Sequence, residues 1–183
     1  AAMKLLIASD IHGSAFSARK IANELKDDMR LIILGDIYNH GPRNPLPEQY
    51  APMQVAVILN SLKDKLTAIQ GNCDSEVDQM ISDFTLNRIY EMNTGGKKLF
   101  FSHGHVYNFD NPPDGLKKGD CVFYGHFHIP FIKEKDGIYF INPGSCSLPF
   151  NSNPKSYALL DTDDFLCKIM DFDGNVLFER YLK

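Results

Sequence analysis

The chain has 183 residues, of which 44% are hydrophobic, and its formal net charge is −4. This length lies within the size range of a single domain and allows a sizeable core, so we expect one domain over residues 1–183. The acidic balance offers no basic stripe for holding the phosphates of a nucleic acid. Extended nucleic-acid binding is therefore disfavoured.

The apolar segments and the N-terminus show no sign of membrane insertion or export. No stretch approaches the roughly 18 to 20 apolar residues of a membrane span, and no basic segment precedes an apolar one at the start. The four cysteines are too sparse for a disulfide framework and have no CxxC spacing. We expect a soluble, cytoplasmic protein with reduced thiols. Ala1 and Ala2 precede Met3 and are expected to be left over from expression.

The first half of the sequence alternates short apolar runs with helical patterns. Strands are expected at KLLIAS, LIIL and LTAI, and helices over Ala15–Leu25, Pro52–Lys63 and Ser75–Ile81. Strands separated by helical crossovers favour parallel pairing, with helices covering the sheet faces.

The second half has three hairpin patterns in a row. They are RIYEMN and KKLFFS around TGG, IPFIKE and IYFIN around KDG, and FLCKIMDF and NVLFERY around Asp173 and Gly174. We therefore predict an α/β fold in which a parallel half meets a more antiparallel half. The segments 38–50 and 107–119 are rich in Pro and Asn and are interpreted as surface loops or lids.

Five of the expected strands end on residues that can bind a metal ion. They are Asp10 and His12 after LLIAS, Asp36 after LIIL, Asn72 after LTAI, His103 after LFFS, and His126 and His128 after CVFY. In open α/β sheets, ligands gather outside the carboxyl ends of the strands, so we expect these groups to converge. All six histidines of the chain lie in predicted loops.

Each of these motifs taken alone has an ordinary structural explanation, such as a turn closed by an Asp side chain. Together they supply seven nitrogen and oxygen ligands, more than one six-coordinate ion can use, so two ions sharing a carboxylate fit better. Mixed carboxylate, amide and imidazole ligation suits Mn, Fe, Zn, Co or Ni. Two such ions can hold a hydroxide and clamp a phosphoryl group, so phosphate-ester hydrolysis is the predicted reaction.

The blocks DIH, GD, GNCD, SHGH and GHFH occur in that order between Asp10 and His128. This pattern resembles the calcineurin-like metallophosphoesterases, whose motifs are DxH, GD, GNxD or GNxE, a histidine after a strand, and GHxH. The resemblance covers most of the chain. It implies a metallophosphoesterase-like α/β fold, a two-sheet β-sandwich flanked by helices, and two divalent ions, commonly Mn²⁺.

The resemblance also implies a role for each matching residue. One ion is held by Asp10, His12 and His128, the other by Asn72, His103 and His126, and Asp36 bridges the two. The expected catalytic group is Asp36, Asn72 and His103 around a metal-bridging hydroxide.

Other residues near these motifs are expected to contact the substrate. Arg43 can grip a phosphate oxygen bidentately or be a solvated loop residue, and His40 lies in the same loop. His105 can line the pocket or bond a backbone carbonyl. Asp74 is expected to orient a neighbouring group or to cap the following helix.

Cys73 stands where many phosphatases of the family have a histidine that protonates the leaving oxygen. A thiol is a weaker acid than an imidazolium and a poor hydrogen-bond donor. We therefore expect Cys73 beside the substrate of a phosphodiesterase that acts on small-molecule diesters, with weak monoesterase activity.

Two alternative functions remain open at this point. One is a phosphomonoesterase acting on nucleotides or phosphoproteins, and the other is a scaffold of the same fold without hydrolytic activity. The seven ligand positions all carry competent residues, which favours an enzyme. The sequence leaves open the physiological diester, the native metal and a homo-oligomeric state.

Overall fold

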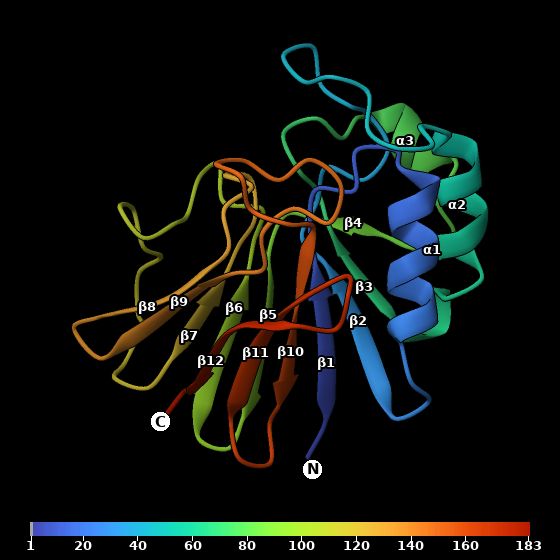
Figure 1. Cartoon of the computed structure of the whole chain (residues 1–183). Coiled ribbons are helices and arrows are strands. Elements are labelled where there is room, and N and C mark those ends of the chain that lie inside the picture. The colour runs from blue at the N-terminus through green and yellow to red at the C-terminus, as the bar shows by residue number, and fades with distance from the viewer. Residues whose placement is uncertain (1) are drawn as a thin grey trace.

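The structure is a computed structural model that describes residues 2–183. Ala1, one of the two residues expected to be left over from expression, lies outside the described residues. Two β-sheets pack face to face, and three helices cover the outer face of the larger sheet (Figure 1). The predicted α/β sandwich flanked by helices is thereby confirmed.

The larger sheet has seven strands in the order β12-β11-β10-β1-β2-β3-β4. Their bounds are β1 Lys4–Ala8, β2 Met29–Ile33, β3 Leu66–Ile69, β4 Leu86–Asn87, β10 Ser156–Asp161, β11 Leu166–Asp171 and β12 Val176–Tyr181. Strands β1 to β4 pair in parallel, and β10 to β12 continue the sheet antiparallel from β1.

The smaller sheet has five strands in the order β5-β6-β7-β9-β8. Their bounds are β5 Tyr90–Thr94, β6 Lys97–Phe101, β7 Cys121–Phe123, β8 Phe131–Lys135 and β9 Ile138–Asn142. The helices are α1 Ala15–Glu24, α2 Pro52–Asn60 and α3 Glu76–Met80, with a 3₁₀ turn at Lys63–Lys65. None of the helices within residues 2–183 is both long and apolar enough to cross a membrane.

Successive side chains of a β-strand point to opposite faces of the sheet, and the packing of the strands follows this two-residue period. In β1, Leu5 and Ile7 lie in the core between the sheets, whereas Leu6 and Ala8 pack toward the helices. Helix α1 begins after Ser14, whose hydroxyl accepts a hydrogen bond from the backbone N–H of Ser17 at 3.1 Å.

A loop, rather than a helix, covers the outer face of the smaller sheet. Phe100, Val122 and Phe140 form a small core there, and Tyr107 and Phe109 pack against it. The segment 107–119, predicted to be a surface loop or lid, thus has a packing role as well.

The three predicted hairpins are confirmed as β5–β6, β8–β9 and β11–β12. The predicted division into a parallel and an antiparallel half does not follow the two sheets, because each sheet is mixed. Strand β10, which was not predicted, pairs with β1 and carries the last hairpin into the larger sheet. In the smaller sheet, β6, β7 and β9 pair in parallel. The carboxyl ends of β1, β2, β3, β6 and β7 therefore meet at the upper edge in Figure 1.

Candidate metal centre

The seven residues predicted to bind metal come together at this edge. Asp10, His12 and His128 offer ligand atoms within 4.8 Å of one another, and so do Asp36, His103 and His126. Asn72 joins the second group, because its Oδ1 lies 2.9 Å from Nε2 of His103 and 3.0 Å from Nδ1 of His126. The predicted convergence of strand ends therefore occurs.

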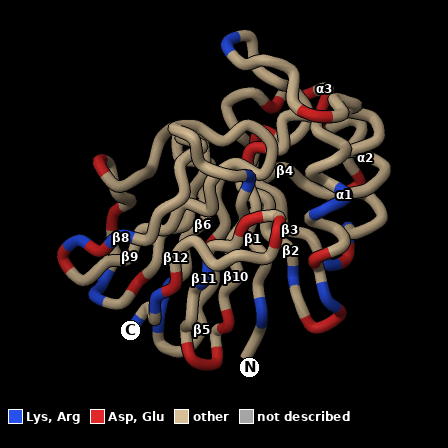
Figure 2. The backbone as a smooth tube through the Cα atoms, viewed as in Figure 1, with Lys and Arg blue, Asp and Glu red and all other residues tan. Residues whose placement is uncertain are grey.

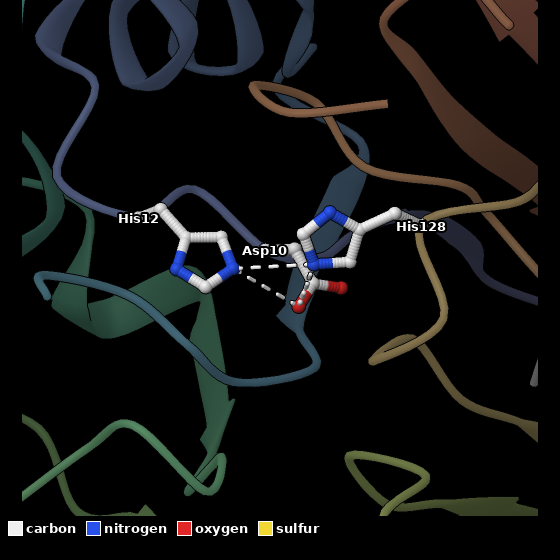
Figure 3. A group of neighbouring side chains, drawn as sticks. All are labelled: Asp10, His12 and His128. Atoms are coloured by element: carbon white, nitrogen blue, oxygen red, sulfur yellow. Dashed lines mark hydrogen bonds and ion pairs between the residues drawn. The ribbon is translucent and has the colours of Figure 1, made fainter. Parts of the chain in front are cut away.

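The first group is buried and closely spaced (Figure 3). Asp10 Oδ1 lies 3.5 Å from Nε2 of His12 and 3.3 Å from Nε2 of His128. The two imidazole Nε2 atoms are themselves 3.3 Å apart. Such spacing places three potential ligand atoms around one point.

Backbone carbonyls determine which ring nitrogen of three histidines faces this region. Nδ1 of His12 donates to Asn39 O at 2.8 Å, and Nδ1 of His103 donates to Leu34 O at 2.7 Å. Nδ1 of His128 donates to Leu148 O at 2.5 Å. A carbonyl only accepts hydrogen bonds, so each Nδ1 carries a proton, and in the neutral ring Nε2 carries a lone pair. All three lone pairs then point to the side chains of the site.

The electrostatics of the site favour a bound cation. Asp10 Oδ1 is buried and has no hydrogen-bond partner among residues 2–183. Burial lowers the pKa of His103, but the carboxylates of Asp36 and Asp10 outweigh it and raise that pKa to about 9. Buried carboxylates need compensating positive charge. The donor set of imidazole nitrogen, carboxylate and amide oxygen fits divalent transition metals.

Backbone strain accompanies the ligand positions. Asp10, His12, Asp36, His126 and His128 all have left-handed backbone conformations, with φ between 49° and 67°. Non-glycine residues adopt this region rarely, although Asp and His do so more often than most. The loops are held in place by neighbours, since the hydroxyls of Ser145 and Ser147 both donate to Asp10 O.

Asp74 ties together the loops after β2 and β3. Its buried carboxylate accepts hydrogen bonds from the backbone N–H groups of Asp36 at 2.8 Å, Ile37 at 2.8 Å and Gly71 at 2.7 Å. Burial raises the pKa of Asp74 to about 6. Of the two expected roles, it has the orienting one, because Ser75 and Asp78 form the capping box of α3.

Replacing Asp74 by alanine is expected to lower the free energy of unfolding by at least about 3 kcal/mol, since three buried N–H donors lose their acceptor. Urea denaturation measures this loss. Asp83→Ala is a suitable control, because Asp83 is exposed and its side chain makes no hydrogen bond or ion pair within residues 2–183; its effect should stay within about 0.5 kcal/mol. Equal stability of the two variants would contradict the bracing role of Asp74.

The glycines of the GD and GN motifs allow these loops to approach closely. A Cβ atom on Gly71 would lie 2.1 Å from Asp36 Oδ1, and one on Gly35 would lie 2.6 Å from the backbone nitrogen of Gly71. Any larger residue would therefore push the loops after β2 and β3 apart.

Two cavities adjoin the cluster, and both are lined by Asn72. The larger, of about 800 Å³, is also lined by Arg43 and Cys73, and the smaller, of about 610 Å³, by His105. His40 lines neither of these two cavities, because its ring packs edge-on against Tyr50. The structure thus brings three of the four predicted substrate-binding residues to the site.

Cys73 lies beside the ligand groups, in surroundings that disfavour the thiolate. Its Sγ is within 4.8 Å of ligand atoms of His12 and Asp36. Burial, together with the carboxylates of Asp36 and Asp74, raises the pKa of Cys73 to about 12. His105, whose pKa is lowered mainly by burial, lies outside the ligand groups found among residues 2–183.

Some residues of the site had no sequence motif to mark them. Backbone acceptors such as Leu34 O and Leu148 O depend on the fold, and no side chain identifies them in advance. Gln70 and Arg88 line the smaller cavity but belong to no motif. Only their positions next to β3 and between β4 and β5 link them to the site.

Comparisons with known proteins agree with this geometry. Residues 3–165 match the model of the calcineurin-like phosphoesterase superfamily domain. The chain is 44% identical over 164 residues to phosphodiesterase YfcE of Escherichia coli K12, covering 88% of this chain and 89% of that protein.

Solved structures show the same fold. YfcE, a phosphoesterase from E. coli, superimposes with a TM-score of 0.94 at 39% identity, covering 99% of this chain and 100% of that one. Vacuolar protein sorting 29 of Cryptosporidium parvum superimposes with a TM-score of 0.66 at 18% identity over 98% of both chains, a likeness of fold alone. The chain therefore belongs to the calcineurin-like phosphoesterase superfamily, which confirms the expected metal-dependent hydrolase of phosphoester bonds.

Proposed function

We propose that this protein is a phosphodiesterase that hydrolyses small-molecule phosphate diesters at a centre of two divalent metal ions. The observation that supports it most strongly is the convergence of three histidine Nε2 atoms, each with Nδ1 bound to a carbonyl, on two buried carboxylates. The similarity to phosphodiesterase YfcE supports the diester as substrate.

The proposed ligand sets follow the two groups of side chains. Asp10, His12 and His128 would hold one ion, Asn72, His103 and His126 would hold the other, and Asp36 would contact both. Two ions held there would lower the pKa of a water molecule to supply the nucleophile and would neutralise charge on the phosphoryl oxygens. Mn²⁺ is the proposed metal, because carboxylate, amide and imidazole ligands together suit it.

The chain's own residues position the substrate. The buried carboxylate of Asp36 and the amide of Asn72 would face the phosphoryl group from the loops after β2 and β3, which Asp74 holds together. Arg43 lines the larger cavity, where its guanidinium would pair with a phosphate oxygen. Cys73 provides no strong acid for a leaving group, which favours diesters over monoester dianions.

Removal of metal is expected to abolish hydrolysis of bis-p-nitrophenyl phosphate, and added Mn²⁺ is expected to restore it. The release of nitrophenolate by EDTA-treated protein, before and after addition of Mn²⁺, Ni²⁺ or Co²⁺, measures this dependence. Parallel assays with p-nitrophenyl phosphate should show slower turnover of the monoester. Absence of turnover with all three metals would favour the scaffold function, and faster monoester turnover would favour the phosphomonoesterase.

A further inference from the structure

The cluster of metal-binding side chains lies where two cavities of different character meet. Asn72 lines both of them. The larger cavity is lined by Phe127 and Phe150, two residues that are 44% and 42% exposed. Its surface therefore suits an aromatic or apolar substituent, because exposed aromatic rings stack well on planar groups.

The smaller cavity has a different lining. Arg88, Gln70, His105 and Tyr107 offer polar groups there, beside the aliphatic side chains of Ile89 and Val106. Arg88 belongs to the segment that crosses from β4 in one sheet to β5 in the other. Arg88 lines the same cavity as Asn72 and His103, so it brings a positive charge to the carboxyl edge. Lys and Arg are fewer at this upper edge than at the lower ends of the strands (Figure 2).

The positive charge of Arg88 is not neutralised by the protein. Within residues 2–183, no carboxylate oxygen lies within 4 Å of its guanidinium, whereas Arg180 pairs with Glu134. Asp74 also lines the cavity, but its oxygens already accept three backbone hydrogen bonds. An anion that enters the cavity would therefore meet an available guanidinium.

A second polar group in the same cavity also lacks a partner. Only 4% of Ser102 is exposed, its Oγ is buried, and no described residue is hydrogen-bonded to that atom. A buried hydroxyl without a partner is unusual in a folded protein. Arg88 is the donor that an entering anion can reach, whereas the hydroxyl of Ser102, at the end of β6, is buried below the surface of the cavity.

We propose that the Arg88 cavity binds the second substituent of the phosphate diester and selects substituents that carry a phosphate group. This assignment rests on the proposed phosphodiesterase function. With the scissile phosphate at the metal centre, one substituent extends over Phe127 and Phe150, and the other enters the cavity of Arg88. Substrates that carry a terminal phosphate on the second substituent are preferred to neutral diesters.

Two substrates that differ only in this charge test the assignment. Thymidine 5′-(4-nitrophenyl phosphate) and its 3′-phosphorylated derivative both release nitrophenolate, and the manganese-loaded protein should have a lower KM for the derivative. Arg88→Gln should reduce the ratio of kcat/KM between derivative and parent by about tenfold, mainly through KM. Arg88→Lys should restore part of this ratio, since it keeps the charge.

Arg30→Gln serves as the matched control, because it removes one exposed arginine at the start of β2 and should leave the ratio unchanged. Isothermal titration calorimetry gives a readout without turnover: Arg88→Gln should weaken binding of thymidine 3′,5′-bisphosphate more than binding of thymidine 5′-monophosphate.

The possible failures are distinguishable. A wild-type protein that hydrolyses neither substrate would overturn the proposed function. A wild-type protein that hydrolyses both without preference, or a ratio that falls in Arg43→Gln but not in Arg88→Gln, would overturn only the assignment of this cavity.

Discussion

Replacing Asp36 by asparagine is expected to lower kcat/KM for bis-p-nitrophenyl phosphate by about 10³-fold. Asp36 Oδ2 lies 3.2 Å from Nε2 of His103 and 3.7 Å from Nε2 of His12, so it lies between the two ligand groups. Its Oδ1 accepts a hydrogen bond from the backbone N–H of Cys73 at 2.9 Å. Asparagine has the same shape and can keep that bond, but it removes the negative charge that both ions would share.

The metal content of Asp36→Asn shows whether the variant loses metal ions or keeps both ions in an unproductive arrangement. Mass spectrometry of the dialysed protein should give two manganese ions per chain for the wild type and fewer for Asp36→Asn. Asp27→Asn is the control, because Asp27 is exposed in the turn before β2 and should change neither value. If Asp36→Asn retained both ions and full activity, Asp36 would not be the shared ligand.

Much of the fold could be predicted because the apolar patterns are local and regular. The three helices, the strands between them and the hairpins each have a periodicity or a turn signal within a few residues. Strand β10 could not be recognised in this way. Tyr157, Ala158 and Leu160 are buried, so the segment lacks the alternation of a half-exposed strand. Its partner β1 is also more than 140 residues away.

The identity of the site residues could be predicted better than their arrangement. The convergence of Asp10, Asp36 and His103 follows from a general property of parallel strands, whose carboxyl ends share one edge. The direction of each imidazole does not follow from this property, because it depends on backbone carbonyls such as Asn39 O. The left-handed backbone at His126 and His128 directs the two rings to different ligand groups.

Replacing Cys73 by histidine is expected to raise the ratio of monoester to diester turnover by about 10- to 100-fold, a part of the 10² to 10⁴ that a general acid contributes. Cys73 lines the larger cavity together with Arg43, where the side chain is half-buried and an imidazole has room to extend. A thiol has a reference pKa of about 8.5 and donates hydrogen bonds weakly, whereas an imidazolium with a pKa near 6.5 is a stronger acid. The added cation also favours a monoester dianion, which carries one more negative charge than a diester.

Two monoesters with different leaving groups separate these two contributions. Nitrophenolate needs little protonation to leave, whereas phenolate from phenyl phosphate depends on an acid. A gain confined to phenyl phosphate would show that the histidine donates a proton, and an equal gain for both would show that its charge stabilises the phosphoryl group. Cys73→Gln is the matched variant, because glutamine is close to histidine in size but supplies neither acid nor charge. If the ratio stayed unchanged in Cys73→His, or if Cys73→Gln raised it equally, the residue at position 73 would not decide between monoester and diester.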